Sequence, residues 1–149
     1  ILLENSKDNL IIRTNVLYDY SKSTSASFLN WVVESLKSEN EINIVEDQWN
    51  NPTWTSSLAV VIEKAIDKGV SGLFHWGDED WINRYEFANK IASTFSLKTS
   101  LIKPILTKDL KQIAKRPLKS GLKTDFAQKI LNLEPPTVEE CLDSIKKQI

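Results

Sequence analysis

Residues 47–53, Asp-Gln-Trp-Asn-Asn-Pro-Thr, place a carboxylate, three amides and a tryptophan in one short segment, and Trp54 follows directly. None of the polar members is typical of a hydrophobic core. Tryptophans beside amides suit stacking on a planar ring, such as a nucleotide base or the face of a sugar. Asp, Asn and Gln are also typical of turns, and Asn51–Pro52 favours turn initiation. Composition therefore leaves a ligand-binding loop and a plain turn both open.

A second group that could do chemistry is basic. Lys115, Arg116, Lys119 and Lys123 surround Pro117 in a segment with the composition of a loop. Guanidinium and ammonium groups held in a loop can bind an anion such as a diphosphate. The alternative is a solvated basic loop, and the charges alone do not decide between the two.

Acidic residues form a third group, with Asp78, Glu79 and Asp80 directly before Asn83, the expected N-cap of a helix. Negative charge is favourable at a helix N-terminus. We therefore favour loop solvation and stabilisation of that helix end over a catalytic role for these three residues.

The sequence lacks the residues that metal sites, glycine-rich phosphate loops and nucleophile elbows require. His75 is the only histidine and is expected to be a partly buried structural residue, and Cys141 is the only cysteine and is expected in the core. One histidine and one cysteine do not make a metal site, so no metal is expected. Neither a glycine-rich phosphate loop nor a nucleophile elbow is present in the sequence.

The charge balance also limits the partners. The chain has 19 basic and 20 acidic residues and a net charge of -1, which gives no electrostatic case for a nucleic-acid or membrane partner. No apolar run approaches the roughly 20 residues that span a bilayer. A single cysteine favours a reducing, cytoplasmic setting.

Alternating strands and helices must position these groups. Apolar and β-branched residues predict a buried strand within 10–19 and short strands over 42–46 and 72–76. The segment 101–105 is extended, but Pro104 excludes it from the centre of a sheet. Helical patterns separate these strands and close the chain. This order favours an α/β architecture with parallel pairing.

Four helices are defined by apolar stripes and end signals. The expected caps are Thr55 or Ser56 with Gly69 at the far end, Asn83 with Glu86, and Thr137 with Glu140. The expected core faces are Phe28, Leu29, Val32, Val33 and Leu36; Leu58, Val61, Ile62, Ala65 and Ile66; Phe87, Ala88, Ile91, Ala92 and Phe95; and Val138, Cys141, Leu142 and Ile145.

An ordered set of motifs spans the chain from about Asn9 to its end: LIIRTNVLY, Asp-Gln-x-x-x-Pro-Thr, GLFHWGDEDWINRYEFANKIA and KRPLKS. Together they resemble the C-terminal half of an extended short-chain dehydrogenase/reductase of the dTDP-4-dehydrorhamnose reductase type. The resemblance implies an α/β fold that combines the C-terminal part of a Rossmann-like parallel sheet with a small mixed α/β substrate-binding lobe. Residues 1–20 would end the Rossmann core, and residues 21–149 would form mostly the lobe, with some elements packing back on the core.

The resemblance also implies a nucleotide-sugar site between the core and the lobe, as is usual for ligands of open α/β sheets. Thr14 and Asn15 would lie at the nicotinamide cofactor. The implied substrate-binding residues are Val16, Asp47, Gln48, Pro52, Thr53 and Arg116. Val16 replaces the tryptophan that the family carries after Arg-Thr-Ser, which leaves the identity of the sugar open.

No catalytic residue is expected within this chain, because the family places its cofactor glycine motif and its Tyr-x-x-x-Lys pair upstream of the matching segments. The chain begins at Ile1 and contains no methionine, and we expect it to be a portion of a longer protein. The full-length protein is expected to be an NAD(P)-dependent oxidoreductase that uses NADPH or NADH to reduce a dTDP-4-keto-6-deoxy sugar. This chain alone is expected to be inactive.

Two alternatives remain open. RTNVLY also resembles a run in nucleotide-sugar epimerases and dehydratases of the same superfamily, although the Asp-Gln-x-x-x-Pro-Thr loop favours a reductase. The FHW…YE region is similar to that of the methionine adenosyltransferase β subunit, a non-catalytic regulatory partner. An intact Tyr-x-x-x-Lys pair upstream would favour the enzyme, and its loss would favour the subunit.

A portion of a Rossmann sheet exposes an apolar edge that its missing strands would cover. We therefore expect the isolated chain to dimerise, aggregate or be only marginally folded unless the N-terminal Rossmann half is supplied. Sedimentation velocity and thermal melts of the chain, with and without that half, test this. A dilute monomer with a sharp cooperative melt would contradict it.

Overall fold

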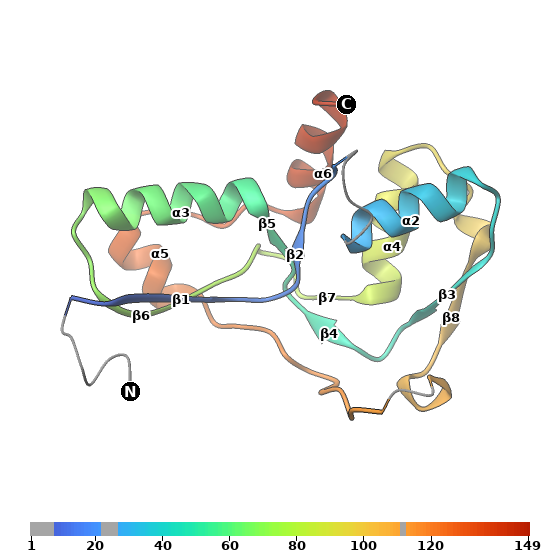
Figure 1. Cartoon of the computed structure of the whole chain (residues 1–149), viewed down its shortest axis with the longest axis horizontal. Helices are drawn as coiled ribbons and strands as arrows, with labels where there is room; N and C mark the ends of the chain where they lie inside the picture. The colour runs from blue at the N-terminus through green and yellow to red at the C-terminus, as the bar shows by residue number, and fades with distance from the viewer. Residues whose placement is uncertain (1–7, 22–26, 111–112) are drawn as a thin grey trace.

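Two parallel strands and two helices form the first of two lobes in the computed structural model, which describes residues 8–21, 27–110 and 113–149 (Figure 1). The elements are β1 (Leu10–Thr14), β6 (Gly72–Trp76), α3 (Thr55–Asp67) and α5 (Asp125–Leu131). The two strands run parallel, from the pair Leu10–Gly72 to the pair Thr14–Trp76. The buried apolar side chains of this lobe are Val61, Ala65, Phe74, Trp76, Ala127 and Leu131.

The second lobe holds the larger core. Its elements are α2 (Phe28–Lys37), β3 (Ile42–Val45), α4 (Arg84–Thr94), η1 (Thr99–Leu101), β8 (Ile102–Ile105), η2 (Thr107–Asp109) and α6 (Val138–Lys147). β3 and β8 pair in parallel, with Ile44 opposite Pro104. In the described part of the chain β8 pairs with β3 alone, so Pro104 lies in an edge strand, as predicted.

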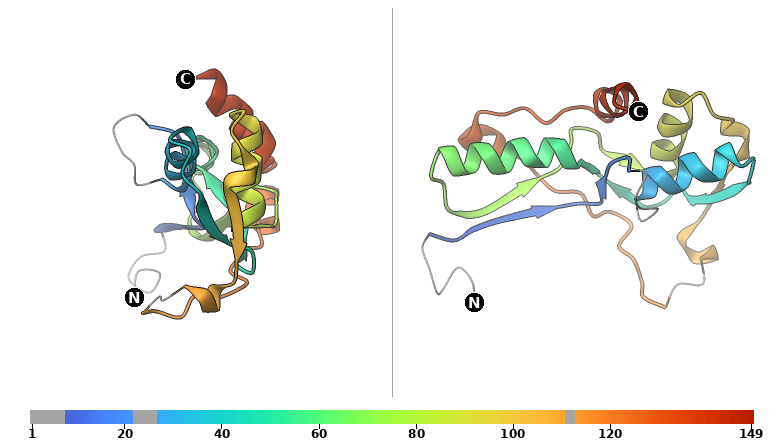
Figure 2. Two further views of the ribbon diagram at one scale, coloured as in Figure 1. Left: turned by 90° about the vertical axis from the view of Figure 1, so that its right-hand side faces the viewer. Right: turned by 45° about the horizontal axis from the view of Figure 1, so that its top comes forward.

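Two very short ladders join the lobes (Figures 1 and 2). β2 (Leu17–Tyr18) pairs in parallel with β5 (Thr53–Trp54), and β4 (Trp49–Asn50) pairs antiparallel with β7 (Ile82–Asn83). The α/β fold class with parallel pairing is therefore confirmed. No helix in the described ranges is long and apolar enough to cross a membrane.

Most of the expected helix ends are confirmed. Asn83 with Glu86 and Thr137 with Glu140 form capping boxes at α4 and α6. Gly69 follows the last residues of α3 with φ 59°, the left-handed conformation that favours glycine. The expected cap of α3 is wrong, because its N-cap is Trp54 and makes no side-chain hydrogen bond there. The Thr55 hydroxyl instead donates to the carboxylate of Asp19.

Three of the four apolar stripes face the core, with Phe28 and Phe95 at its margin. The stripe of α3 is wrong in part, since only Val61 and Ala65 of its members are buried. Ile62 and Ile66 are 41% and 69% exposed. β1 is not a buried strand either, because four of its residues are half-buried and Arg13 is exposed. In the described residues β1 has β6 as its only neighbouring strand, so the lobe offers too little surface to cover either element.

Most of the polar segment 47–53 is buried between the lobes, although its polar members are not typical of a core. Its buried members are Gln48, Asn50, Asn51, Pro52 and Thr53. Asn51 connects three segments. Its Oδ1 accepts from Asn15 Nδ2 at 2.7 Å and from the Leu122 backbone N–H at 2.9 Å, and its Nδ2 donates to Leu122 O at 3.2 Å. The Asn51 amide is therefore structural, because its hydrogen bonds replace those to water that burial removes.

Gly77 packs so closely on Asn51 that a side chain does not fit. A Cβ at Gly77 would lie 2.4 Å from Asn51 Nδ2 and 3.0 Å from its backbone oxygen. We predict that Gly77→Ala lowers the free energy of unfolding by ~1–3 kcal/mol, the usual effect of overpacking. Gly121→Ala is the comparison, because its Cβ would overlap only with the half-exposed side chain of Trp81, at 1.7 Å from the nearest ring atom, and with no backbone atom. Urea unfolding measures both, and equal losses would contradict the prediction.

Candidate functional site

A cavity of about 280 Å³ opens between α2, β3, the start of α4 and the segment around residue 116. Its lining residues are Phe28, Trp31, Asn43, Ile44, Val45, Gln48, Arg84, Leu110 and Arg116. Two arginines and two aromatic rings thus share one cavity, and the described residues that line it include no carboxylate. The lining combines flat apolar surface with positive charge.

The positive charge of Arg84 is unfavourable at its place in the helix α4. It is the first residue of α4, where the helix dipole favours an anion over a cation. Its guanidinium lies over the Phe28 ring, 5.5 Å from the centroid. Burial lowers the pKa of Arg84, and the positive charge of Arg116 lowers it further. Neither arginine makes an ion pair within the described ranges. An anion between the two arginines would offset both the unfavourable helix dipole at Arg84 and the repulsion between the two positive charges.

Asp47 and Gln48 attach the η2 turn to the wall of this cavity. The Asp47 carboxylate accepts from the Thr107 backbone N–H at 2.9 Å and from its hydroxyl at 2.6 Å. Gln48 Nε2 donates to the same hydroxyl at 3.0 Å. Asp47 therefore positions the turn, while Gln48 also lines the cavity.

A very small second cavity, of about 10 Å³, lies at the junction of the lobes. Its lining residues are Val16, Asn50, Pro52, Ile82, Asn83, Arg84 and Phe87. Arg84 lines both cavities, so the two adjoin. Thr53 is fully buried, and its backbone N–H donates to Val16 O at 2.9 Å. The β2–β5 ladder therefore brings Val16, Pro52 and Thr53 together.

The residues expected at the site fall into two neighbouring groups. Asp47, Gln48 and Arg116 belong to the larger cavity or its wall. Val16, Pro52 and Thr53 gather at the junction, and Asn15 reaches it through Asn51. Thr14 ends β1 opposite Trp76 and lines neither cavity.

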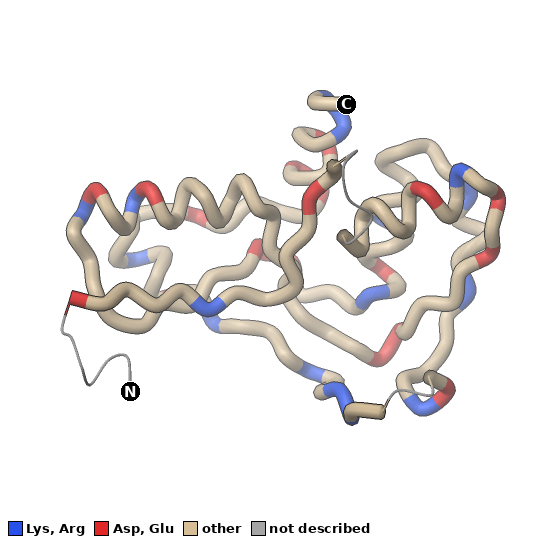
Figure 3. Tube along the Cα trace, in the orientation of Figure 1, with Lys and Arg blue, Asp and Glu red and all other residues tan. Residues whose placement is uncertain are grey.

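Sequence reasoning missed Phe28, Trp31 and Arg84. Phe28 is expected on the core face of its helix and the sequence pattern assigns no role to Trp31, but both line the cavity. Arg84 carried a usable signal, since a cation directly after an N-cap opposes the helix dipole. Among the basic loop residues, all four of which are exposed, only Arg116 lines the cavity. Figure 3 shows basic positions along the segment below the lobes.

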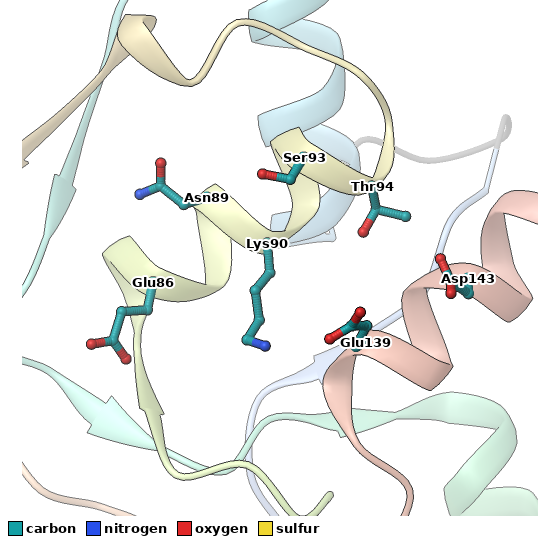
Figure 4. Close-up of a pocket in the computed structure, with 7 residues that line it drawn as sticks. All are labelled: Glu86, Asn89, Lys90, Ser93, Thr94, Glu139 and Asp143. Carbon is teal, nitrogen blue, oxygen red and sulfur yellow. The ribbon is translucent and has the colours of Figure 1, made fainter.

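A larger cavity, of about 610 Å³, lies between α4 and α6 (Figure 4). Glu86, Glu139 and Asp143 contribute carboxylates to it, and Lys90 extends between the first two. This groove is net negative, so it disfavours a phosphate-containing ligand. Size alone therefore does not identify the candidate site.

The sequence matches the family described as RmlD substrate binding domain over residues 1–149. This chain belongs to that family.

Similar proteins include the probable low-salt glycan biosynthesis reductase Agl14 of Haloferax volcanii, which is 28% identical over 141 residues, or 93% of this chain and 47% of the relative. The methionine adenosyltransferase 2 subunit beta of Bos taurus is 27% identical over 111 residues, or 70% of this chain and 33% of that protein.

The crystal structure of dTDP-4-dehydrorhamnose reductase from Bacillus anthracis str. Ames in complex with NADP matches with a TM-score of 0.85 and 28% identity. The match covers 94% of this chain and 48% of that one. The RmlD-family chain therefore spans about half the length of such relatives. Its expected fold, the C-terminal part of a Rossmann-like sheet with a mixed α/β lobe, is confirmed.

The acidic group 78–80 does not serve α4, which corrects the sequence-based interpretation. Asp80 Oδ2 accepts from the Val138 backbone N–H at 2.6 Å and thereby stabilises the start of α6. Asp78 is 1% exposed. Its Oδ2 accepts from the Tyr18 hydroxyl at 3.0 Å and from the Trp54 backbone N–H at 2.8 Å. Burial raises the pKa of Asp78 to about 6, although these hydrogen bonds oppose the rise.

This pKa sets a pH dependence for the RmlD-family domain. A rise from 3.8 to about 6 corresponds to ~3 kcal/mol. The folded-state pKa is raised, so this stability is fully present below pH 4 and is lost as the pH increases through about 6. We predict that Asp78→Asn matches the wild type near pH 4 and is more stable above pH 7.

Urea unfolding between pH 4 and pH 8 measures this difference. Glu79→Gln, which removes the neighbouring exposed acid, is the control and should follow the wild-type pH curve. Parallel curves for the wild type and Asp78→Asn would show that Asp78 is not the group responsible.

Proposed function

We propose that this chain is the substrate-binding half of an NAD(P)-dependent reductase that acts on a dTDP-4-keto-6-deoxy sugar. The arginine pair carries the proposal. Arg84 and Arg116 face one cavity whose described lining has no carboxylate, and burial together with the nearby charge of Arg116 lowers the pKa of Arg84. A diphosphate is the anion that matches two guanidinium groups and neutralises both.

In this proposal each part of a nucleotide sugar has its own residues. The diphosphate lies between Arg84 and Arg116, and the base packs against Phe28 and Trp31 on the same wall. The sugar extends past Arg84 toward Val16 and Pro52. Asp47 acts indirectly, because it fixes the turn beside Gln48.

The chain's contribution to the reaction is then binding and orientation. The nicotinamide cofactor, NADPH or NADH, would supply the hydride, and Thr14 and Asn15 would lie beside it at the end of β1. The Asn15 amide group is fixed by Asn51, so this edge of the cofactor site is preorganised. The proton donor would belong to the N-terminal Rossmann half, the partner that completes the sheet beside β1.

A regulatory role is the second candidate. It is favoured by the similarity to methionine adenosyltransferase 2 subunit beta, whose identity to this chain is close to that of the reductases. Turnover separates the two. The full-length gene product should oxidise NADPH when a dTDP-4-keto-6-deoxy sugar is added, whereas a purely regulatory subunit would not.

The arginine pair gives a sharper test. We predict that Arg116→Ala and Arg84→Ala each weaken binding of dTDP to the full-length gene product by about tenfold or more, since each removes charge-assisted hydrogen bonds to phosphate. Lys115→Ala is the matched control, because Lys115 precedes Arg116 but does not line the cavity. Isothermal titration calorimetry provides the affinities. An Arg116→Ala affinity equal to that of the control would exclude the proposed diphosphate position.

A further inference from the structure

The β2–β5 ladder is too short to be held by its backbone alone. It consists of two residue pairs, Leu17–Thr53 and Tyr18–Trp54. A two-residue ladder has few hydrogen bonds and is marginal without support from side chains. Yet this ladder brings Val16 beside Pro52, at the small cavity that adjoins Arg84.

Asp78 supplies the missing support. One of its carboxylate oxygens, Oδ2, accepts from the Tyr18 hydroxyl at 3.0 Å and from the Trp54 backbone N–H at 2.8 Å, and these two residues are register partners. The Cys141 thiol approaches the same oxygen at 3.8 Å from α6. A single atom therefore ties β2, β5 and α6 together.

The groups that face this carboxylate are all neutral. They are the Tyr18 phenol from β2, the Cys141 thiol from α6, the Trp54 N–H and the Ser57 hydroxyl. Burial raises the pKa of both Tyr18 and Cys141, which keeps them protonated as donors. Oδ1 is buried without a hydrogen-bond partner in the described part of the chain, although Ser57 is near enough to affect the pKa. No described cation pairs with Asp78.

We propose that Asp78 is a positioning residue, in which one carboxylate oxygen fixes β2 against β5 and thereby fixes the positions of Val16 and Pro52 at the sugar end of the proposed site. This inference rests on the proposed function, because it assigns the sugar end of that site. A buried carboxylate without a cation lowers stability, and such groups are retained where they organise a site. An amide of the same shape accepts hydrogen bonds more weakly than a carboxylate and holds the ladder less firmly.

The test uses the full-length gene product with Asp78→Asn. At pH 8 we expect the KM for the dTDP-4-keto-6-deoxy sugar to rise about tenfold, the usual consequence of weakening a charge-assisted hydrogen bond. The affinity for dTDP should stay within about twofold, because dTDP occupies the arginine cavity and not the ladder. At pH 5 a protonated Asp78 resembles the amide, so the difference between variant and wild type should shrink.

Several outcomes would overturn the inference. They are an unchanged KM at pH 8, an equal loss of sugar and dTDP affinity, or a KM difference that does not depend on pH. Glu79→Gln removes an adjacent exposed acid and should behave as the wild type. If Asp78→Asn does not fold, Tyr18→Phe replaces it, since this variant removes one donor and retains the ring that packs on Phe87. Tyr18→Phe with wild-type KM would then refute the proposal.

Turnover of the sugar by the wild-type protein shows whether a failure concerns this inference or the proposed function. A wild-type protein that does not turn over the sugar contradicts the proposed function itself. Turnover by the wild type, combined with an unaffected Asp78→Asn variant, contradicts the positioning role alone.

Discussion

The structure depends on polar contacts buried between two separate apolar cores. One core gathers around α3, β6 and α5, and the other around α2, α4 and α6. The chain crosses between them through ladders of two residue pairs, which bury little apolar surface of their own. Hydrogen bonds of Asn51 and Asp78 therefore hold the lobes in register. Because such bonds are directional, the junction fixes an orientation that apolar packing alone would leave loose.

The proposed substrate path follows from this arrangement. The arginine cavity belongs to the second lobe, whereas Val16 lies between β1 of the first lobe and β2. A ligand that reaches both must lie across the junction. The polar character of segment 47–53 thus has two causes, since Asn51 bonds to the Leu122 backbone and Gln48 lines the arginine cavity.

Local patterns predicted the fold well and the site less well. Capping boxes and stripes depend on residues within one or two turns, so Asn83, Thr137 and the core face of α2 were correctly placed. Asp78 was misplaced because its donors are far away in the sequence, at Tyr18, Trp54 and Cys141. The lining of the arginine cavity likewise depends on contacts between residues far apart in the sequence. Arg116 was identified by charge, but Phe28 joins it only through the packing of α2 beside α4.

The parallel ladders have a consequence for synthesis on the ribosome. β1 pairs with β6 and β3 with β8, and the paired residues lie about sixty positions apart. At ~5–20 residues per second, each first strand waits several seconds for its partner to be translated. Contacts of this range also slow folding, because a long loop must close before they form. The early strand LIIRT is rich in apolar and β-branched residues. Until β6 is translated, this strand is unpaired in the nascent chain and can bind chaperones or other chains.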